Sequence, residues 1–143
     1  MFDAFLSDDH RNTFFHGHSF TANPVGCAAA LASMDLLERP ECQQQLEWIA
    51  EQHGVFKKRL AHHPGLADIR QRGTILALEF QTKEESGYFN QLKAQLVDFF
   101  LARGVLLRPL GNVVYILPPY CIQADELQQV YEVLEAALDK FTA

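Results

Sequence analysis

One segment of the sequence is small and apolar on every side of an expected helix. After Asn23-Pro24, residues 25–34 read Val-Gly-Cys-Ala-Ala-Ala-Leu-Ala-Ser-Met and carry no charge. Asn23 can accept a hydrogen bond from a free N–H of the first turn, and Pro24 has no N–H to leave unpaired, so a helix should begin here and run to about Glu38. A helix without a polar face is typical of one enclosed by other elements. A chain of 143 residues has little material for such a cover, so we expect part of it to come from another surface.

The composition describes a globular protein and argues against several kinds of partner. Hydrophobic residues make up 48% and charged residues 21%, which excludes an intrinsically disordered chain. With 12 Lys and Arg against 18 Asp and Glu, the net charge of −6 argues against binding to nucleic acid or to an anionic membrane. The longest uncharged stretch, residues 12–34, is interrupted by polar clusters, so we expect it to be buried in protein rather than in lipid.

The cysteines and the N-terminus favour a cytoplasmic protein. The start of the sequence lacks the basic and apolar regions of a signal peptide, so export is not expected. The three cysteines have neither a CxxC pair nor any other metal-ligand spacing. We interpret them as reduced core thiols: Cys27, Cys42 and Cys121.

The rest of the sequence alternates between amphipathic helices and short strands. Helical spacing of apolar residues predicts three helices, at about 42–60, 89–103 and 127–141. Extended apolar runs predict four strands, at 66–72, 74–80, 105–108 and 113–117, of which the last two form an antiparallel hairpin. The predicted fold class is therefore α+β, with a short antiparallel sheet covered by helices on one face and preceded by a long helix.

The loop before the first helix, residues 15–24, contains the first candidate site. It is polar in its middle, aromatic at its shoulders and leads into a helix N-terminus. Gly17 would let a phosphate approach the backbone N–H groups, and Ser19 would add a hydroxyl donor without bulk. An ordinary helix-entry loop remains an alternative. A metal held by His16 and His18 is a weaker one, because no carboxylate or thiolate lies at a helpful spacing.

Arg108 is the second candidate. It interrupts an apolar segment and begins a stretch to Ala124 with no other charge. Its guanidinium matches a carboxylate through two parallel hydrogen bonds, so we expect either an internal ion pair or a substrate acid as its partner. His53 lies in the apolar stripe of the long helix and is interpreted as a satisfied core histidine, whereas His62 and His63 should face water.

Two blocks of the sequence resemble the class III aminotransferases, which use pyridoxal 5′-phosphate. The first is Gly-His-Ser-Phe-Thr-Ala-Asn-Pro at residues 17–24, with the Ala-rich run that follows. The second spans residues 104–112 and 115–122, and is more particularly similar to the members that act in biotin synthesis. The blocks are in the family's order and spacing. The resemblance covers nearly the whole chain, but only the C-terminal part of the family's chain.

The resemblance implies a fold-type I enzyme and a role for each candidate residue. Residues 1–40 would be the end of the large domain, and residues 41–143 the small C-terminal domain. His18 and Ser19 would contact the cofactor phosphate of the neighbouring subunit in a homodimer, and Gly17 would lie against the substrate. Many members have Pro and Thr where this chain has His18 and Ser19, so the hydroxyl is kept. Arg108 would bind the carboxylate of 8-amino-7-oxononanoate.

The implied reaction is a ping-pong transamination with S-adenosylmethionine as amino donor, giving 7,8-diaminononanoate. In the family, the Schiff-base lysine belongs to sequence upstream of this segment. The lysines here lie in predicted helices or a polar loop, so no catalytic residue is expected in this chain: Lys57, Lys58, Lys83, Lys93 and Lys140. Two alternatives remain open: a class III aminotransferase acting on other ω-amino acids, and a non-catalytic interaction module.

Overall fold

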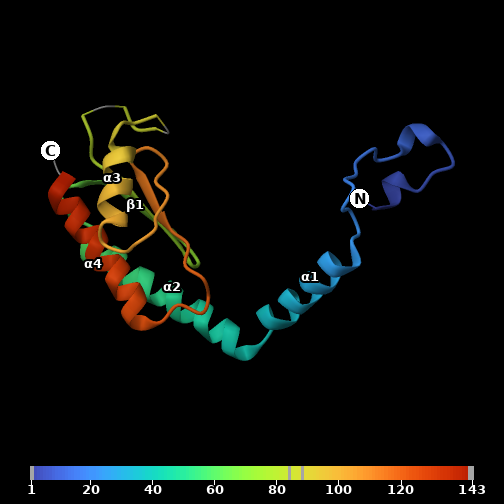
Figure 1. Cartoon of the computed structure of the whole chain (residues 1–143), viewed down its shortest axis with the longest axis horizontal. Helices are drawn as coiled ribbons and strands as arrows, with labels where there is room; N and C mark the ends of the chain where they lie inside the picture. Colours follow the sequence, from blue (N-terminus) through green and yellow to red (C-terminus); the bar gives the residue numbers. More distant parts are fainter. Residues whose placement is uncertain (1, 84, 88, 142–143) are drawn as a thin grey trace. The chain divides into compact units, whose positions relative to one another are not determined.

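The computed structural model describes residues 2–83, 85–87 and 89–141. The chain divides into two compact units, Met1–Glu38 and Arg39–Ala143, and each is described here by itself (Figure 1). The described helices and strands contain no helix that is both long and apolar enough to cross a membrane.

The first unit consists of two short 3₁₀ helices, Phe2–Phe5 and His10–Asn12, and helix α1, Pro24–Leu37. The predicted start of α1 is confirmed, because the side chain of Asn23 accepts a hydrogen bond from the backbone N–H of Val25 at 3.0 Å. None of the residues of α1 is buried. The described residues of the first unit therefore do not by themselves cover α1.

Exposure of α1 predicts that the isolated chain self-associates. Leu31, at the middle of the helix, is 62% exposed, and an apolar surface of this kind is a typical interaction site. At a protein concentration on the order of tens of micromolar, the chain should sediment as a dimer or larger species. Leu31→Glu should shift this equilibrium toward the monomer. Val55→Glu is the matched control, because Val55 is 63% exposed in the second unit. Sedimentation velocity with all three proteins monomeric would contradict the prediction.

The second unit contains a three-stranded antiparallel sheet and three helices. The strands are β1, Leu66–Arg72, β2, Ile75–Phe80, and β3, Val113–Ile116, in the order β1-β2-β3. The helices are α2, Pro40–Leu60, α3, Leu92–Leu101, and α4, Ala124–Phe141. Helix α2 packs against β1 and β2, and α3 packs against α4 (Figure 1). The predicted α+β class is confirmed.

The core forms where the apolar face of the sheet meets the helices. Leu76, Leu78 and Phe80 alternate along β2 and are all buried, while the residues between them are not. Leu78 pairs with Ile69 of β1 and with Val114 of β3, so this register puts the apolar side chains of β2 and β3 on one face.

The predicted strand at 105–108 is wrong. No secondary structure is assigned to residues 105–109, whose backbone is not paired in the sheet, and an isolated bridge joins Leu110 to Val113. The apolar run that predicted a strand has another role: Val105 and Pro109 are buried, and the residues at 106 and 108 are exposed. Packing on the core, rather than ladder hydrogen bonds, explains the pattern.

Three smaller expectations are also corrected. Helix α3 begins at Leu92, and Phe89, which was expected inside it, is 92% exposed. All three cysteines are free, but Cys27 and Cys121 are exposed, so they are not core thiols. Cys27 is exposed because it lies on the uncovered helix α1. His63 is partly buried rather than facing water, because Gly65 donates to its Nδ1 and its Nε2 lies 3.2 Å from Asp139.

His53 is a satisfied core histidine, as predicted. Its side chain is 0% exposed, with Nε2 at 3.1 Å from the carbonyl oxygen of Thr74 and Nδ1 at 2.6 Å from the hydroxyl of Tyr131. A carbonyl only accepts, so Nε2 carries the proton, and the neutral ring accepts from Tyr131 through Nδ1. Burial lowers the pKa of His53 and raises the pKa of Tyr131. The core is therefore built around a neutral imidazole.

This arrangement predicts a loss of stability in acid. The pKa of His53 is lower in the folded chain than the ordinary value of 6.5, so below that pH the unfolded chain binds more protons and is favoured. The free energy of unfolding should be level above about pH 7.5 and fall below about pH 6.5, by at most about 1.4 kcal/mol per pH unit. Urea titrations between pH 5 and 8 should show this slope in the native sequence and in His62→Gln, but not in His53→Gln. An equal slope in all three would contradict it.

Candidate functional site

The loop before α1 contains a tight turn closed by Thr21. The backbone N–H of Thr21 donates to the carbonyl oxygen of His18 at 2.9 Å, and the N–H of His18 donates back to Thr21 Oγ1 at 2.7 Å. A third bond, from the N–H of Asn23 to the carbonyl of Phe20, joins this turn to the start of α1. The paired bonds between His18 and Thr21 leave Ser19 at the tip of the turn.

The ring of His18 belongs to a row of aromatic rings along the loop. It stacks on Phe20 with ring centroids 5.2 Å apart and meets His16 edge-on at 5.0 Å. Phe14 extends the row, at 5.5 Å from His16. These contacts hold the His18 ring in place on one side of the turn.

The loop has the properties of an anion-binding segment. Within the described ranges, the hydroxyl of Ser19 has no hydrogen-bond partner. No atom lies within 4 Å of the position that a Cβ on Gly17 would take, so a ligand can approach the backbone there. The surrounding residues 12–34 carry no acidic side chain that would repel an anion. Free donors, open space and the absence of acids fit the phosphate of a cofactor.

Sequence reasoning missed two residues of this loop. A signal for Thr21 exists, since a hydroxyl three residues after His18 is a common partner for a turn N–H. Ala22 gives no such signal. It has a positive φ of 56°, in the left-handed region that glycine adopts without cost, so a side chain is held there under strain.

Arg108 is exposed and free. The guanidinium makes no hydrogen bond or ion pair with any residue that the structure describes, so the internal ion pair considered above is not found. The reason is its place in the 105–109 segment, where Pro109 turns into the core and Arg108 turns outward. A free guanidinium is available to a ligand acid.

The backbone beside Arg108 is fixed by the buried side chain of Asn112, another residue that sequence reasoning missed. Leu110 and Val113 exchange two backbone hydrogen bonds, of 2.8 and 3.2 Å, around a two-residue turn that begins with Gly111 at φ 66°. Asn112, 1% exposed, donates through Nδ2 to the carbonyl of Phe80 at 2.9 Å. Its Oδ1 accepts from the N–H of Gly87 at 3.1 Å. The segment that presents Arg108 is therefore anchored to the sheet.

The structure brings together three of the four predicted site residues. Gly17, His18 and Ser19 share one loop of the first unit, and Arg108 belongs to the second unit. Among the described residues, no three His, Cys, Asp or Glu side chains gather as metal ligands. All five lysines belong to the second unit, and none is buried: Lys57, Lys58, Lys83, Lys93 and Lys140.

Comparison with known proteins identifies the family. The model of the family described as "Aminotransferase class-III" matches residues 2–138. The chain belongs to this family. Class-III aminotransferases use pyridoxal 5′-phosphate.

Two curated relatives of this class-III chain have the same name. The adenosylmethionine-8-amino-7-oxononanoate aminotransferase of Synechococcus elongatus is 41% identical over 98% of the chain, and that of Geobacter sulfurreducens is 37% identical over 99%. A solved structure with that name from Methanocaldococcus jannaschii matches 97% of the chain with a TM-score of 0.82 and 24% identity, and shows the same fold. The class-III chain spans about a third of each relative: 32% of the first two and 33% of the third.

Proposed function

We propose that this chain forms the C-terminal part of an aminotransferase of biotin synthesis. The enzyme would convert 8-amino-7-oxononanoate to 7,8-diaminononanoate, with S-adenosylmethionine as the amino donor. The observation that carries the proposal is the 41% identity over 98% of the chain to a curated relative with that name. We place the enzyme in the cytoplasm as a homodimer, with residues 1–40 ending its large domain and residues 41–143 forming the small domain. The division of the chain after Glu38 supports this partition.

The turn at Ser19 is proposed to hold the phosphate of pyridoxal 5′-phosphate. The free hydroxyl of Ser19 donates to a phosphate oxygen, and backbone N–H groups of the turn add further donors. His18 contacts the phosphate from the same turn. Gly17 lies against the substrate, where a side chain would be in the way. When bound, the cofactor supplies an electron sink for the chemistry at the amino-bearing carbon.

Arg108 is proposed to bind the carboxylate of the substrate. A guanidinium and a carboxylate form two parallel charge-assisted hydrogen bonds, which fix both the position and the direction of the acid. The free guanidinium and the anchored turn beside it support this role. The residues of this chain therefore bind and orient, and proton transfer belongs to groups outside it.

A hybrid enzyme tests the proposal. The C-terminal third of the Synechococcus elongatus relative would be replaced by this chain, and transamination of 8-amino-7-oxononanoate measured with S-adenosylmethionine as donor. We expect activity in the hybrid and none in the isolated chain, whose lysines are not placed in a buried pocket. A folded hybrid that binds the cofactor and accepts only other ω-amino acids would assign the chain to a different class-III activity. A folded hybrid without cofactor binding would refute the proposal.

Removal of the Ser19 hydroxyl should weaken cofactor binding. A hydrogen bond to a charged group contributes about 1.5–3 kcal/mol, so Ser19→Ala should raise the Kd for pyridoxal 5′-phosphate by roughly 10- to 150-fold in the hybrid. Spectroscopic titration of the apoenzyme gives this Kd. Binding of pyridoxal, which lacks the phosphate, should not change. Ser33→Ala in α1 is the control, and an equal effect of both substitutions would count against a phosphate contact.

A further inference from the structure

Two consecutive turns join the loop of the first unit to α1. In the first turn, the N–H of Thr21 donates to the carbonyl oxygen of His18 at 2.9 Å. In the second, the N–H of Asn23 donates to the carbonyl oxygen of Phe20 at 3.1 Å. Every residue from 12 to 24 is exposed, so within the described chain these turns are held by hydrogen bonds rather than by packing. No buried contact there compensates for the loss of one hydrogen bond.

The hydroxyl of Thr21 closes the first turn a second time. Its Oγ1 accepts from the N–H of His18 at 2.7 Å, so Thr21 engages both backbone groups of His18. The N–H groups of the two central residues, Ser19 and Phe20, have no partner in the part of the chain that the structure describes. An anion at this turn therefore finds the N–H of His18 occupied and those of Ser19 and Phe20 available.

The hydroxyl of Thr21 is also an uncommon contact for this loop. Among the described residues, its bond to His18 is the one side-chain hydrogen bond between residues 15 and 22. The next residue, Ala22, has a φ of 56°, which a residue other than glycine keeps only when its neighbours hold it. The conformation of the turn therefore depends strongly on this one acceptor.

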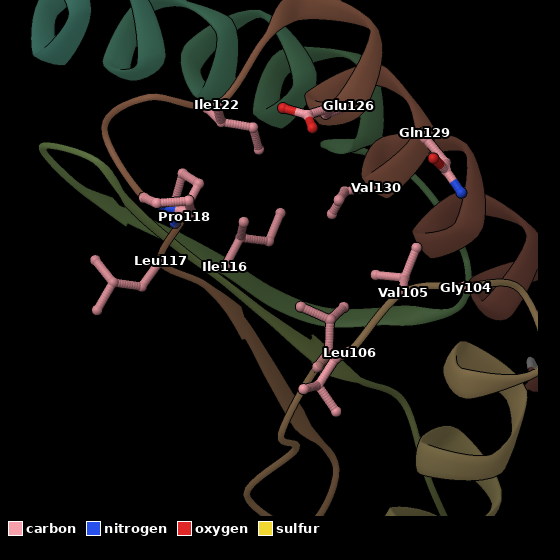
Figure 2. A pocket seen from close by; sticks show the side chains of 12 residues that line it. Gly104, Val105, Leu106, Ile116, Leu117, Pro118, Ile122, Glu126, Gln129 and Val130 are labelled. Atoms are coloured by element: carbon pink, nitrogen blue, oxygen red, sulfur yellow. The ribbon is translucent and has the colours of Figure 1, made fainter.

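A groove in the second unit does not offer an equivalent anion site. It has a volume of about 350 Å³ and lies between residues 104–107, the end of β3 and α4 (Figure 2). Its described lining is mainly apolar and carries one charge, the carboxylate of Glu126, which accepts from the N–H of Gln123 at 2.8 Å. This negative charge would repel a phosphate, so the turn at Ser19 is the better place for one.

We propose that Thr21 is a positioning residue of the phosphate site and acts through the hydroxyl of Ser19. By accepting the N–H of His18, Thr21 Oγ1 fixes the turn so that Ser19 presents its hydroxyl and its N–H to one phosphate. The role of Thr21 is indirect, since it bonds to the backbone of His18 and not to the anion. The inference rests on the proposed phosphate site and adds to it the residue that sets its geometry.

A double-mutant cycle with Ser19 tests the inference. The Kd for pyridoxal 5′-phosphate is measured by spectroscopic titration of four hybrid apoenzymes: native, Ser19→Ala, Thr21→Val and the double variant. Valine is similar in shape to threonine but has no acceptor, so Thr21→Val should raise the Kd about three- to tenfold, the effect of one neutral hydrogen bond. In the Ser19→Ala background, the same substitution should raise the Kd less than about twofold, because the hydroxyl that Thr21 positions is gone.

Two further variants and a second readout complete the test. Thr21→Ser keeps the acceptor and should return the Kd to within about twofold of the native value. Thr13→Val is the matched control, because Thr13 is exposed in the same unit and its hydroxyl has no partner among the described residues. In the full chain without cofactor, amide temperature coefficients should show the N–H of His18 bonded in the native and Thr21→Ser forms and free in Thr21→Val.

The outcomes separate this inference from the proposed phosphate site. If Ser19→Ala leaves the Kd unchanged, the phosphate contact and the role of Thr21 both fail. If Ser19→Ala weakens binding but Thr21→Val does not, or makes it tighter, the role of Thr21 alone fails. Equal effects of Thr21→Val in both backgrounds would mean that Thr21 contacts the anion itself or only stabilises the fold, and would overturn the positioning role.

Discussion

Replacing Phe56 with alanine should lower the free energy of unfolding by about 3–5 kcal/mol. Phe56 is 2% exposed and stacks on Tyr131 with ring centroids 4.1 Å apart and an angle of 13° between the rings. Tyr131 in turn donates to the buried ring of His53, so the cavity would open beside a hydrogen-bonded pair. A loss of this size is a large fraction of the about 5–15 kcal/mol that stabilises a typical domain.

The measurement is urea denaturation of the full chain, followed by circular dichroism. Val55→Ala is the matched control, because Val55 precedes Phe56 on α2 but is 63% exposed and should change stability by less than about 0.5 kcal/mol. Equal midpoints for the two variants would mean that the stacked pair does not contribute to the core as described.

Arg108→Ala should raise the KM for 8-amino-7-oxononanoate in the hybrid enzyme by roughly 10- to 150-fold. This range corresponds to about 1.5–3 kcal/mol, the contribution of hydrogen bonds to a charged group. Because Arg108 has no partner among the described residues, its removal should leave no buried group unpaired, and stability should hardly change. The effect should therefore appear in substrate binding rather than in folding.

Two further variants define the role of the guanidinium. Arg108→Lys keeps the charge but loses the bidentate geometry, so its KM should lie between those of the native and alanine forms. Arg72→Ala removes an exposed arginine of β1 for which no ion pair is found in the described chain, and it should leave KM unchanged. Unchanged KM and kcat in Arg108→Ala would exclude the proposed contact with the acid.

Local signals predicted most of the helices and strands. The Asn23-Pro24 pair marked the start of α1, and the apolar stripe of α2 identified its buried face, including His53. These predictions succeeded because capping and helical periodicity depend on residues only a few positions apart. Strand pairing depends on partners far along the chain. The apolar run at 105–108 could therefore be mistaken for a strand, although Val105 and Pro109 are buried without strand pairing.

The site residues show the same limit. The sequence marked Ser19 as a possible anion ligand and left Arg108 between two partners, and only the structure shows that its guanidinium is free. Asn112 lies in the turn between Leu110 and Val113. Its side chain contacts Phe80 and Gly87, which lie 32 and 25 residues away in the sequence. No local sequence pattern predicts these contacts. The strained φ of Ala22 likewise follows from how the turn closes onto α1, not from the residue itself.

The uncovered helix α1 has a consequence for the fate of the chain. No residue of α1 is buried, so its order must be supported by association with a second surface. Association follows mass action, and the ordered fraction therefore rises with the concentration of that surface. Copies of the chain made in excess of the surface that binds α1 would expose an apolar helix to chaperones and proteases. Their lifetime would therefore be short. The amount of chain that persists would then be set by the supply of the covering surface rather than by the rate of synthesis.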